Sequence, residues 1–460
     1  MDSLRRRDRG LSADRDPGRR CLDRSATACI LGGRRVSPAA VFASFFALVL
    51  VGAPIAIALG LTGAAAAWLA GFPMVLIPTR FFSSLDNFAL LAAPFYIFAG
   101  ELMNRGGITE TLITFAAKMT RWVKGGAAYA NILASMFFAG ISGTAIADTA
   151  ALGKIFITGM PKQGYTREFS AAVTVASSMI GPIIPPSVIM IVYASVAQVS
   201  IIKLFVAGIV PGLLLGLACA VVVFLTGLRK GLPKGEIEAV RKPGGQLALE
   251  SLLVFSIPLF IVWGTLSGAF TATEAGGVAC VYALVLGRFV LRTLSGPSVI
   301  EALKSAIRTT SNLYLIIAGA SVLSYVLTVT GAISGVREMT VLFAGDPTIF
   351  LFFVLAVLLI AGFFLEPGVQ VLLLAPILLP IARALGIEEM QFAMVFLLSG
   401  TLSLMTPPVG ICLFVAAQIG EIRIGRMFIA ILPFLAAQIL AISLLILWPD
   451  LVTFLPNLIE

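Results

Sequence analysis

Histidine is absent from this chain of 460 residues, and cysteine is scarce. Histidine is the commonest metal ligand and a frequent general base in proteins, so its absence argues against a metalloenzyme. The five cysteines show no metal-binding spacing and predict no disulfide framework; they are Cys21, Cys29, Cys219, Cys280 and Cys412. We therefore expect a protein that is not an enzyme and that carries no cofactor.

Charged residues are also scarce, at 12% of the chain against 59% hydrophobic residues. Soluble domains contain about 25% charged residues, so the composition excludes an ordinary soluble domain. Several apolar runs reach the roughly 20 residues that a membrane-spanning helix needs. The runs cover residues 41–70, 88–104, 126–160, 170–197, 205–227, 248–266, 271–290, 310–333, 348–383, 391–418 and 427–448. We predict an all-α polytopic membrane protein.

Two of these runs, 126–160 and 348–383, are too long for one spanning helix. Small or helix-disrupting residues interrupt them, at 140–144 and 365–368. Both runs are typical of re-entrant helical hairpins. Irregular backbone is tolerated at membrane depth only where protein or a water-filled cavity satisfies its polar groups. We therefore expect both hairpin tips to be buried beside a binding site.

The chain contains an internal repeat. Residues 140–197 superimpose without a gap on residues 362–419, at an offset of 222. The only two Pro-Pro pairs, beginning at Pro185 and Pro407, occupy the same place in both segments. Paired, interrupted apolar segments in corresponding halves of a membrane protein indicate the binding site of a transporter.

The repeat predicts how the chain is organised. We expect a first transmembrane repeat at 41–228, a cytoplasmic loop and joining helix at 229–270, and a second repeat at 271–460. Four crossings followed by one joining crossing place the second repeat in the membrane upside down, so the repeats are predicted to be inverted. The fold class expected is that of elevator-type ion transporters, with re-entrant hairpins and broken transmembrane helices.

Charge distribution predicts the orientation. Residues 1–40 form a basic, disordered arm, and ten arginines against five aspartates in residues 1–36 supply more than half of the net charge of +9. Because most of the net positive charge lies in this arm, it does not indicate a nucleic-acid partner. Basic residues in the loops after residues 117, 161 and 228 fall on one side, which the positive-inside rule assigns to the cytoplasm.

Two polar, amphipathic stretches, 73–88 and 295–311, stand beside the first helix of each repeat. Their charged faces predict short interfacial helices that lie along the headgroup boundary and brace a moving domain. Ordinary polar loops are the alternative.

The first Pro-Pro segment predicts an ion site. Pro182, Pro185 and Pro186 each lack an N–H, so the helix must unwind and expose carbonyl oxygens near Gly181. Serine and threonine hydroxyls lie nearby in the sequence and on the facing hairpin tip. Carbonyl and hydroxyl oxygens favour hard cations, which indicates sodium as the coupling ion.

The second Pro-Pro segment has the same break, and its hairpin tip carries Glu366. An intramembrane carboxylate is costly enough to suggest a function, so Glu366 is an ion ligand, a helix cap or a proton carrier. Half-helix N-termini at the breaks favour an anion, which predicts an organic acid as cargo. The predicted ion and substrate residues are Ser142, Gly143, Thr144, Ser177, Ser178, Gly181, Pro182, Pro185, Ser187, Glu366, Pro367, Gly368, Ser399, Thr401, Ser403, Thr406, Pro407 and Gly410.

Four other charged residues fall within apolar segments. Asp148 and Lys154 lie six residues apart, so they share a helix face poorly. Glu101 and Glu274 are predicted to be structural, with helix capping as the role of Glu274.

From residue 41 onward the chain resembles the large membrane subunit of tripartite ATP-independent periplasmic (TRAP) transporters. The resemblance rests on SGTAIAD at 142–148, ASSMIGPIIPPS at 176–187, TATEAGGVACVYAL at 271–284, PILLPIARALGI at 376–387 and TPPVG at 406–410. It implies a sodium-driven symporter of the bacterial inner membrane that imports organic acids, dicarboxylates among them, by an elevator motion. The implied partners are a periplasmic substrate-binding protein and a small four-helix membrane subunit, expected as a separate chain.

This sequence departs from the family at three positions. The family commonly has threonine where this chain has Met179, and asparagine and glycine where it has Ser399 and Ser403. Two alternatives remain open: a sodium/carboxylate symporter that needs no receptor, and a membrane scaffold that does not transport. A neighbouring gene for a secreted receptor would exclude the first alternative. Loss of function on replacing Ser142, Thr144 and Glu366 would exclude the second.

Overall fold

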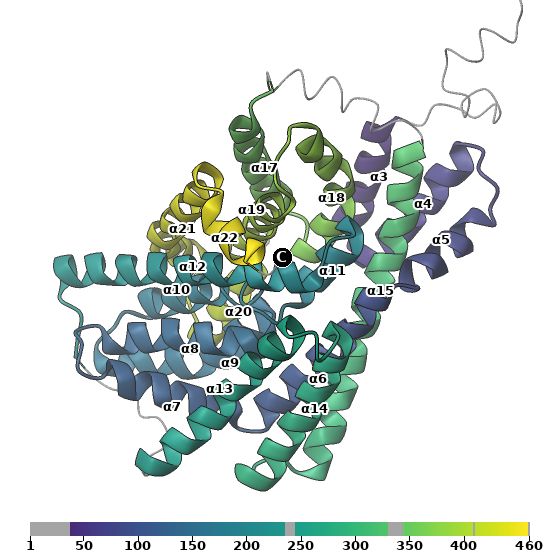
Figure 1. Ribbon diagram of the computed structural model, residues 1–460. Helices are drawn as coiled ribbons and strands as arrows, with labels where there is room; N and C mark the ends of the chain where they lie inside the picture. The colour runs from purple at the N-terminus through teal and green to yellow at the C-terminus, as the bar shows by residue number, and fades with distance from the viewer. Residues whose placement is uncertain (1–36, 235–243, 330–342, 344, 408–409, 459–460) are drawn as a thin grey trace, which may run out of the picture.

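The computed structural model describes residues 37–234, 244–329, 343, 345–407 and 410–458 (Figure 1). Within these ranges every regular element is a helix, which confirms the all-α fold class. Six of the described helices are long and apolar enough to cross a membrane. Of the arm predicted at 1–40, residues 1–36 lie outside the described residues, and residues 38–40 are not part of a disordered arm because they begin a helix.

The run at 41–70 forms two helices and not the single apolar segment expected from the sequence. Helix α3 (Pro38–Leu50) ends before Gly52, whose φ of +94° terminates the helix, and Pro54 precedes α4 (Ile55–Leu69). Left-handed backbone is readily adopted by glycine, and proline cannot continue a preceding helix. The two residues together break the run.

The two amphipathic stretches behave differently. The first forms the short helix α5 (Leu76–Leu85), which is bent by 56° from the segment of η1 (Phe88–Leu91) and α6 (Ala92–Arg105). The second is not a separate helix, because it is the beginning of the 34-residue helix α15 (Gly296–Val329). No glycine or proline interrupts α15 between Pro297 and Gly319, so the helix continues from the polar stretch into the apolar one.

Both predicted hairpins are pairs of helices joined by a tight turn. Helices α8 (Gly126–Ser142) and α9 (Ala145–Gly159) form the first, and α17 (Pro347–Ala361) and α18 (Pro367–Ala384) form the second. The helix α7 (Ile108–Thr120) packs along α8.

Both Pro-Pro segments interrupt a helix. The first lies between α10 (Arg167–Ser178) and α11 (Val188–Ala197), and its Pro185–Pro186 bond is cis. The second lies between α19 (Glu389–Leu402), with the short η4 (Ser403–Met405), and α20 (Ile411–Gly420). Pro408 and Val409 lie outside the described residues.

The remaining elements complete the chain. They are η2 (Met160–Gln163), α12 (Ile201–Lys230), α13 (Gly244–Leu266), α14 (Ala272–Val285) with the π-helical turn η3 (Leu286–Val290), α21 (Ile424–Leu447) and α22 (Asp450–Asn457).

The helices gather into two groups, which Figure 1 shows side by side. In the first, which we call the lateral bundle, α15 packs against α4, α5 and α6, with α3 on α4 and α14 on α6. Small residues allow close approach: a Cβ atom on Gly63 would lie 2.9 Å from the Leu323 nitrogen of α15. The second group, the hairpin bundle, contains α8 to α12 and α17 to α22.

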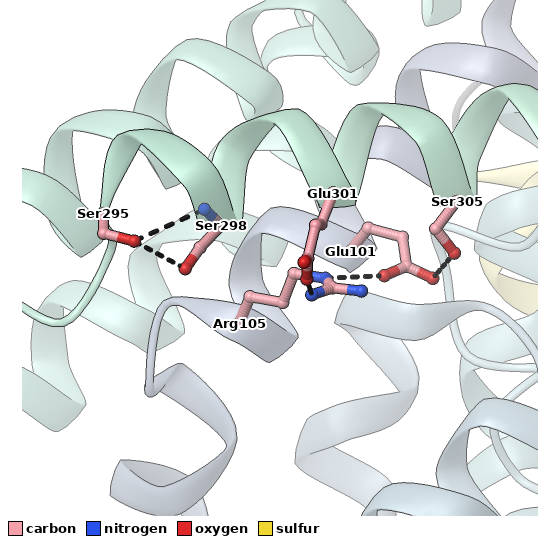
Figure 2. A network of polar contacts seen from close by, with 6 residues as sticks. All are labelled: Glu101, Arg105, Ser295, Ser298, Glu301 and Ser305. Carbon is pink, nitrogen blue, oxygen red and sulfur yellow. Dashed lines mark hydrogen bonds and ion pairs between the residues drawn. The ribbon is translucent and has the colours of Figure 1, made fainter.

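A polar network holds α6 against α15 inside the lateral bundle (Figure 2). The Arg105 guanidinium lies 3.5 Å from Glu101 on its own helix and 2.7 Å from Glu301 of α15. Ser305 of α15 donates to Glu101 at 2.8 Å. Glu101 therefore has a structural role, as the sequence predicted. Glu274 also has one, because it forms a capping box with Thr271 at the start of α14.

Candidate functional site

A cavity of about 100 Å³ lies where both hairpin tips and both broken helices meet. Seven of the predicted site residues line it: Gly143, Thr144, Pro182, Glu366, Pro367, Gly368 and Thr401. Apolar side chains of α11 and η4 complete the wall, and α15 of the lateral bundle contributes Leu313. Segments up to about 260 residues apart in the chain thus converge on one small space.

Three helix N-termini face this cavity. The first residues of α9, α11 and α18 all line it, and these helices come from the first hairpin, the first broken helix and the second hairpin. The N-terminus of a helix carries unpaired N–H groups and a partial positive charge. The backbone therefore makes the cavity suitable for an anion.

The first hairpin tip packs closely on the first broken helix. Gly143 adopts a φ of +60°, and a Cβ atom there would lie 2.9 Å from the Pro186 carbonyl oxygen. Thr144 caps α9, since its hydroxyl accepts from the Ala147 N–H at 3.4 Å. Glycine at 143 is thus required by both the turn and the contact.

Asp148, one turn into α9, was not among the predicted site residues. Its side chain is fully buried, Ser142 donates a hydrogen bond to Oδ1, and Oδ2 has no hydrogen-bond partner among the described residues. Gly181 of the first break lies against this carboxylate, because a Cβ atom on Gly181 would collide with Oδ2. A buried carboxylate with an unused oxygen is a strong candidate for a cation ligand.

The second repeat places neutral groups at the equivalent positions. Gln370 and Ser403 lie 222 residues after Asp148 and Gly181, and they too touch each other. The Gln370 amide donates to the Ser403 hydroxyl at 3.3 Å and to the Leu365 carbonyl at 3.0 Å. The same pair of positions is thus in contact in both repeats, with a carboxylate facing glycine in one and an amide facing serine in the other.

Glu366 occupies the N-cap position of α18 but makes no capping hydrogen bond through its side chain. It is partly buried and lines the cavity. The helix-cap alternative therefore has no support from the geometry. A carboxylate beside three helix N-termini can hold a cation next to a bound anion.

Other predicted site residues lie away from the cavity wall. Ser178 and Ser399 donate to carbonyls of their own helices, at 2.7 and 2.6 Å, and Ser177 pairs with Ser135 at 2.7 Å. Ser187 caps α11 and donates to the Pro182 carbonyl at 2.5 Å, so this carbonyl is already hydrogen-bonded. The others lie at the tips or breaks without lining the cavity: Ser142, Gly181, Pro185, Ser403, Thr406, Pro407 and Gly410.

The position of Asp148 could have been found from the repeat. The offset of 222 pairs Asp148 with Gln370, both one turn beyond a hairpin tip. The spacing of Asp148 and Lys154 does not reveal this relation.

Comparison with known proteins gives a consistent family. Residues 42–451 match the family described as "Tripartite ATP-independent periplasmic transporter, DctM component". The chain is 35% identical over 377 residues to the sialic acid TRAP transporter large permease protein SiaM of Vibrio cholerae, covering 81% of this chain and 87% of SiaM. It is 37% identical over 380 residues to the C4-dicarboxylate TRAP transporter large permease protein DctM of Pseudomonas aeruginosa, covering 82% and 88%.

Among solved structures, the fold is similar to that of the transporter YdaH of Alcanivorax borkumensis, whose crystal structure is described as having an unusual topology. The TM-score is 0.60 at 15% identity, and the match covers 81% of this chain and 87% of YdaH. At this identity the similarity concerns the fold alone.

Proposed function

Because the chain belongs to the family of DctM components of tripartite ATP-independent periplasmic transporters, we propose that it carries an organic acid across the membrane through the cavity between its hairpin tips. The chain is a multi-pass membrane protein and a transporter subunit, not an enzyme. The observation that carries the proposal is the meeting of three helix N-termini at one cavity.

The proposed cargo is a carboxylate. Two relatives are named for sialic acid and C4-dicarboxylates, and both of these compounds bear carboxylate groups. The N-termini of α9, α11 and α18 supply N–H donors to such a group, and none of the described residues of the cavity wall is basic.

The proposed coupling ion is sodium. An anionic cargo beside Glu366 and near Asp148 would be repelled unless a cation lay close to them. The carboxylate of Asp148, the hydroxyl of Ser142 and backbone carbonyls of the first break are hard oxygen ligands of the kind sodium prefers. Cation binding would thus make the cavity attractive to the acid, which couples the two fluxes.

The proposed motion is that of an elevator. Both hairpins and both broken helices belong to the hairpin bundle, whereas Leu313 is the lateral bundle's contribution to the cavity wall. A displacement of the hairpin bundle along the lateral bundle would carry the cavity from one membrane face to the other. In this proposal the repeats are inverted, and the membrane is the bacterial inner membrane.

We propose two partners. One is a soluble periplasmic binding protein that delivers the acid, and the other is a small membrane subunit. The alternative, a sodium/carboxylate symporter, would need no periplasmic binding protein.

A labelling experiment tests the site. Val192→Cys places a thiol in the cavity wall, and Ser195→Cys places one on the same helix outside it, both in a chain whose native cysteines are replaced. A C4-dicarboxylate together with sodium is expected to slow modification of Val192→Cys by a small thiosulfonate reagent several-fold and to leave Ser195→Cys unchanged. Equal effects, or none, at both positions would contradict binding in this cavity.

A further inference from the structure

A second cavity, of about 660 Å³, opens on the outer face of the hairpin bundle, between α12, α21 and the start of α10. One end of it carries Arg229 of α12 and Arg426 of α21. Most of the other residues of its wall are apolar. None of the residues of the transport site lines it, so it is a separate feature of the molecule.

This second cavity, which we call the groove, has the dimensions of a lipid. Lining residues of α21 run from Arg426 to Leu440, which corresponds to about 21 Å of helix. One leaflet of a bilayer has a hydrocarbon depth of about 15 Å. Phe434 and Val222 are buried at the floor, whereas Ile429 and Leu440 on the rim are 69% and 66% exposed. The groove is therefore open toward the bilayer along its length.

The charges at its polar end suit an anion. Arg229 and Arg426 are both exposed, and neither forms an ion pair with another described residue. Arg426 lies in the first turn of α21, which contains no acidic residue, so the helix dipole opposes its charge. An anion between Arg229 and Arg426 would offset the unfavourable interaction of the Arg426 charge with the α21 dipole.

Among the described residues of the groove wall, Glu168 alone is acidic. It stands in the first turn of α10, where the helix dipole stabilises a carboxylate, and a single carboxylate does not balance two arginines. The neighbouring Arg167 lies 4.0 Å from Glu421, so this pair adds no net negative charge beside the groove.

We propose that this groove binds an anionic phospholipid, with the phosphate between Arg229 and Arg426 and an acyl chain along α12 and α21. Basic pockets between membrane helices on the cytoplasmic side bind anionic headgroups, and the loop charges predict that this end faces the cytoplasm. The occupant would cover the hairpin bundle on its lipid-facing side, away from the lateral bundle.

The test is native mass spectrometry of the full chain with phosphatidylglycerol or phosphatidylcholine of identical acyl chains. Wild-type protein is expected to retain phosphatidylglycerol preferentially. The pair Arg229→Gln and Arg426→Gln should weaken this retention about 25-fold, at about fivefold for each arginine. The matched control, Arg423→Gln with Arg121→Gln, removes two exposed positive charges outside the groove and should retain the lipid.

A second variant, Ala437→Phe, fills the apolar part of the groove without changing charge and should also reduce retention. A result in which the control pair weakens retention as much as the groove pair would overturn the proposal. Equal retention of both lipids by wild-type protein would overturn it too. Displacement of the lipid by millimolar inorganic phosphate would identify a free-phosphate site instead.

Discussion

At the scale of single residues, the contact between Asp148 and Gly181 distinguishes the two repeats. The carboxylate has one oxygen bonded to Ser142 and one without a hydrogen-bond partner among the described residues, and it lies where a Cβ atom on Gly181 would collide with it. The equivalent contact in the second repeat, between Gln370 and Ser403, is hydrogen-bonded and uncharged. If a cation drives transport as proposed, we expect it to bind at this contact in the first repeat.

Gly181→Ala should disrupt this site without unfolding the protein. The new methyl group meets the Asp148 carboxylate and must displace it, so sodium-dependent uptake is expected to fall by at least about tenfold, equivalent to about 1.4 kcal/mol. Gly277→Ala is the control, because nothing lies within 4 Å of its Cβ position. Similar uptake by both variants would exclude a role for the Asp148–Gly181 contact.

Glu366→Ala should reduce transport while leaving thermal stability nearly unchanged, because Glu366 makes no capping hydrogen bond. Glu274→Ala should do the reverse, since Glu274 accepts from the Thr271 N–H at 2.8 Å in the capping box of α14. Unfolding midpoints and uptake rates of the two variants check the prediction. A large stability loss in Glu366→Ala would indicate a structural carboxylate.

Residue roles were only partly predictable from the sequence. Thr144, Glu366 and Thr401 line the cavity as expected, because tips and breaks mark positions that the spacing of the prolines reveals. Ser177, Ser178 and Ser399 were expected there but turn to other partners. Which way a helical hydroxyl points depends on the rotation of each helix within the bundle, and a single sequence does not specify this rotation.

At the scale of elements, a buried glutamine connects the second hairpin to the second broken helix by hydrogen bonds. Gln370 of α18 is fully buried, and its amide bonds the Leu365 carbonyl and the Ser403 hydroxyl. Gln391 of α19 is a close counterpart away from the site, since its amide donates to two carbonyls of α21 at 3.2 and 3.1 Å.

Gln370→Ala and Gln391→Ala should each lower stability by about 2–3 kcal/mol, because each removes two buried hydrogen bonds and leaves a small void. Only Gln370→Ala is expected to alter the sodium concentration at half-maximal uptake, since the Gln370 amide bonds a carbonyl of the hairpin tip whereas the Gln391 amide bonds carbonyls of α21. Thermal unfolding and sodium titrations of uptake would separate the two effects. A similar shift in both variants would mean that general loosening affects transport.

The elements themselves were largely predictable where proline and glycine mark them. Both hairpins and both broken helices occur at the predicted places, because Pro-Pro pairs and glycine tips have direct backbone consequences. The separation of α3 from α4 was missed, although Gly52 and Pro54 signal it. The continuity of α15 was missed because the sequence changes from polar to apolar along the helix. The backbone nevertheless stays helical throughout.

At the scale of the whole molecule, the proposed elevator transport requires the hairpin bundle to move along the lateral bundle. Leu313 of α15 and Gly368 of α18 line the same cavity from the two bundles. Joining them as Leu313→Cys and Gly368→Cys with a short bifunctional reagent should abolish uptake, and reversal of the link should restore it.

The control for this link joins two elements of the lateral bundle. Ser321→Cys and Arg80→Cys are neighbours, because the Ser321 hydroxyl donates to the Arg80 carbonyl at 3.1 Å. Cross-linking this pair, again in a chain whose native cysteines are replaced, should leave uptake unchanged. Full uptake by the linked Leu313 and Gly368 pair would contradict motion between the bundles.

Sodium-coupled transport of an organic acid is tested most directly by uptake into proteoliposomes that contain this chain with the small membrane subunit. Labelled organic acids would be supplied with and without an inward sodium gradient and with and without the periplasmic binding protein. We expect uptake of a carboxylate that requires both the gradient and the binding protein, and that the Gly181→Ala variant largely loses. Sodium-driven uptake without the binding protein would support the receptor-independent symporter. Uptake that is indifferent to sodium, or its absence from a well-folded complex for every acid, would contradict a sodium-coupled organic acid transporter.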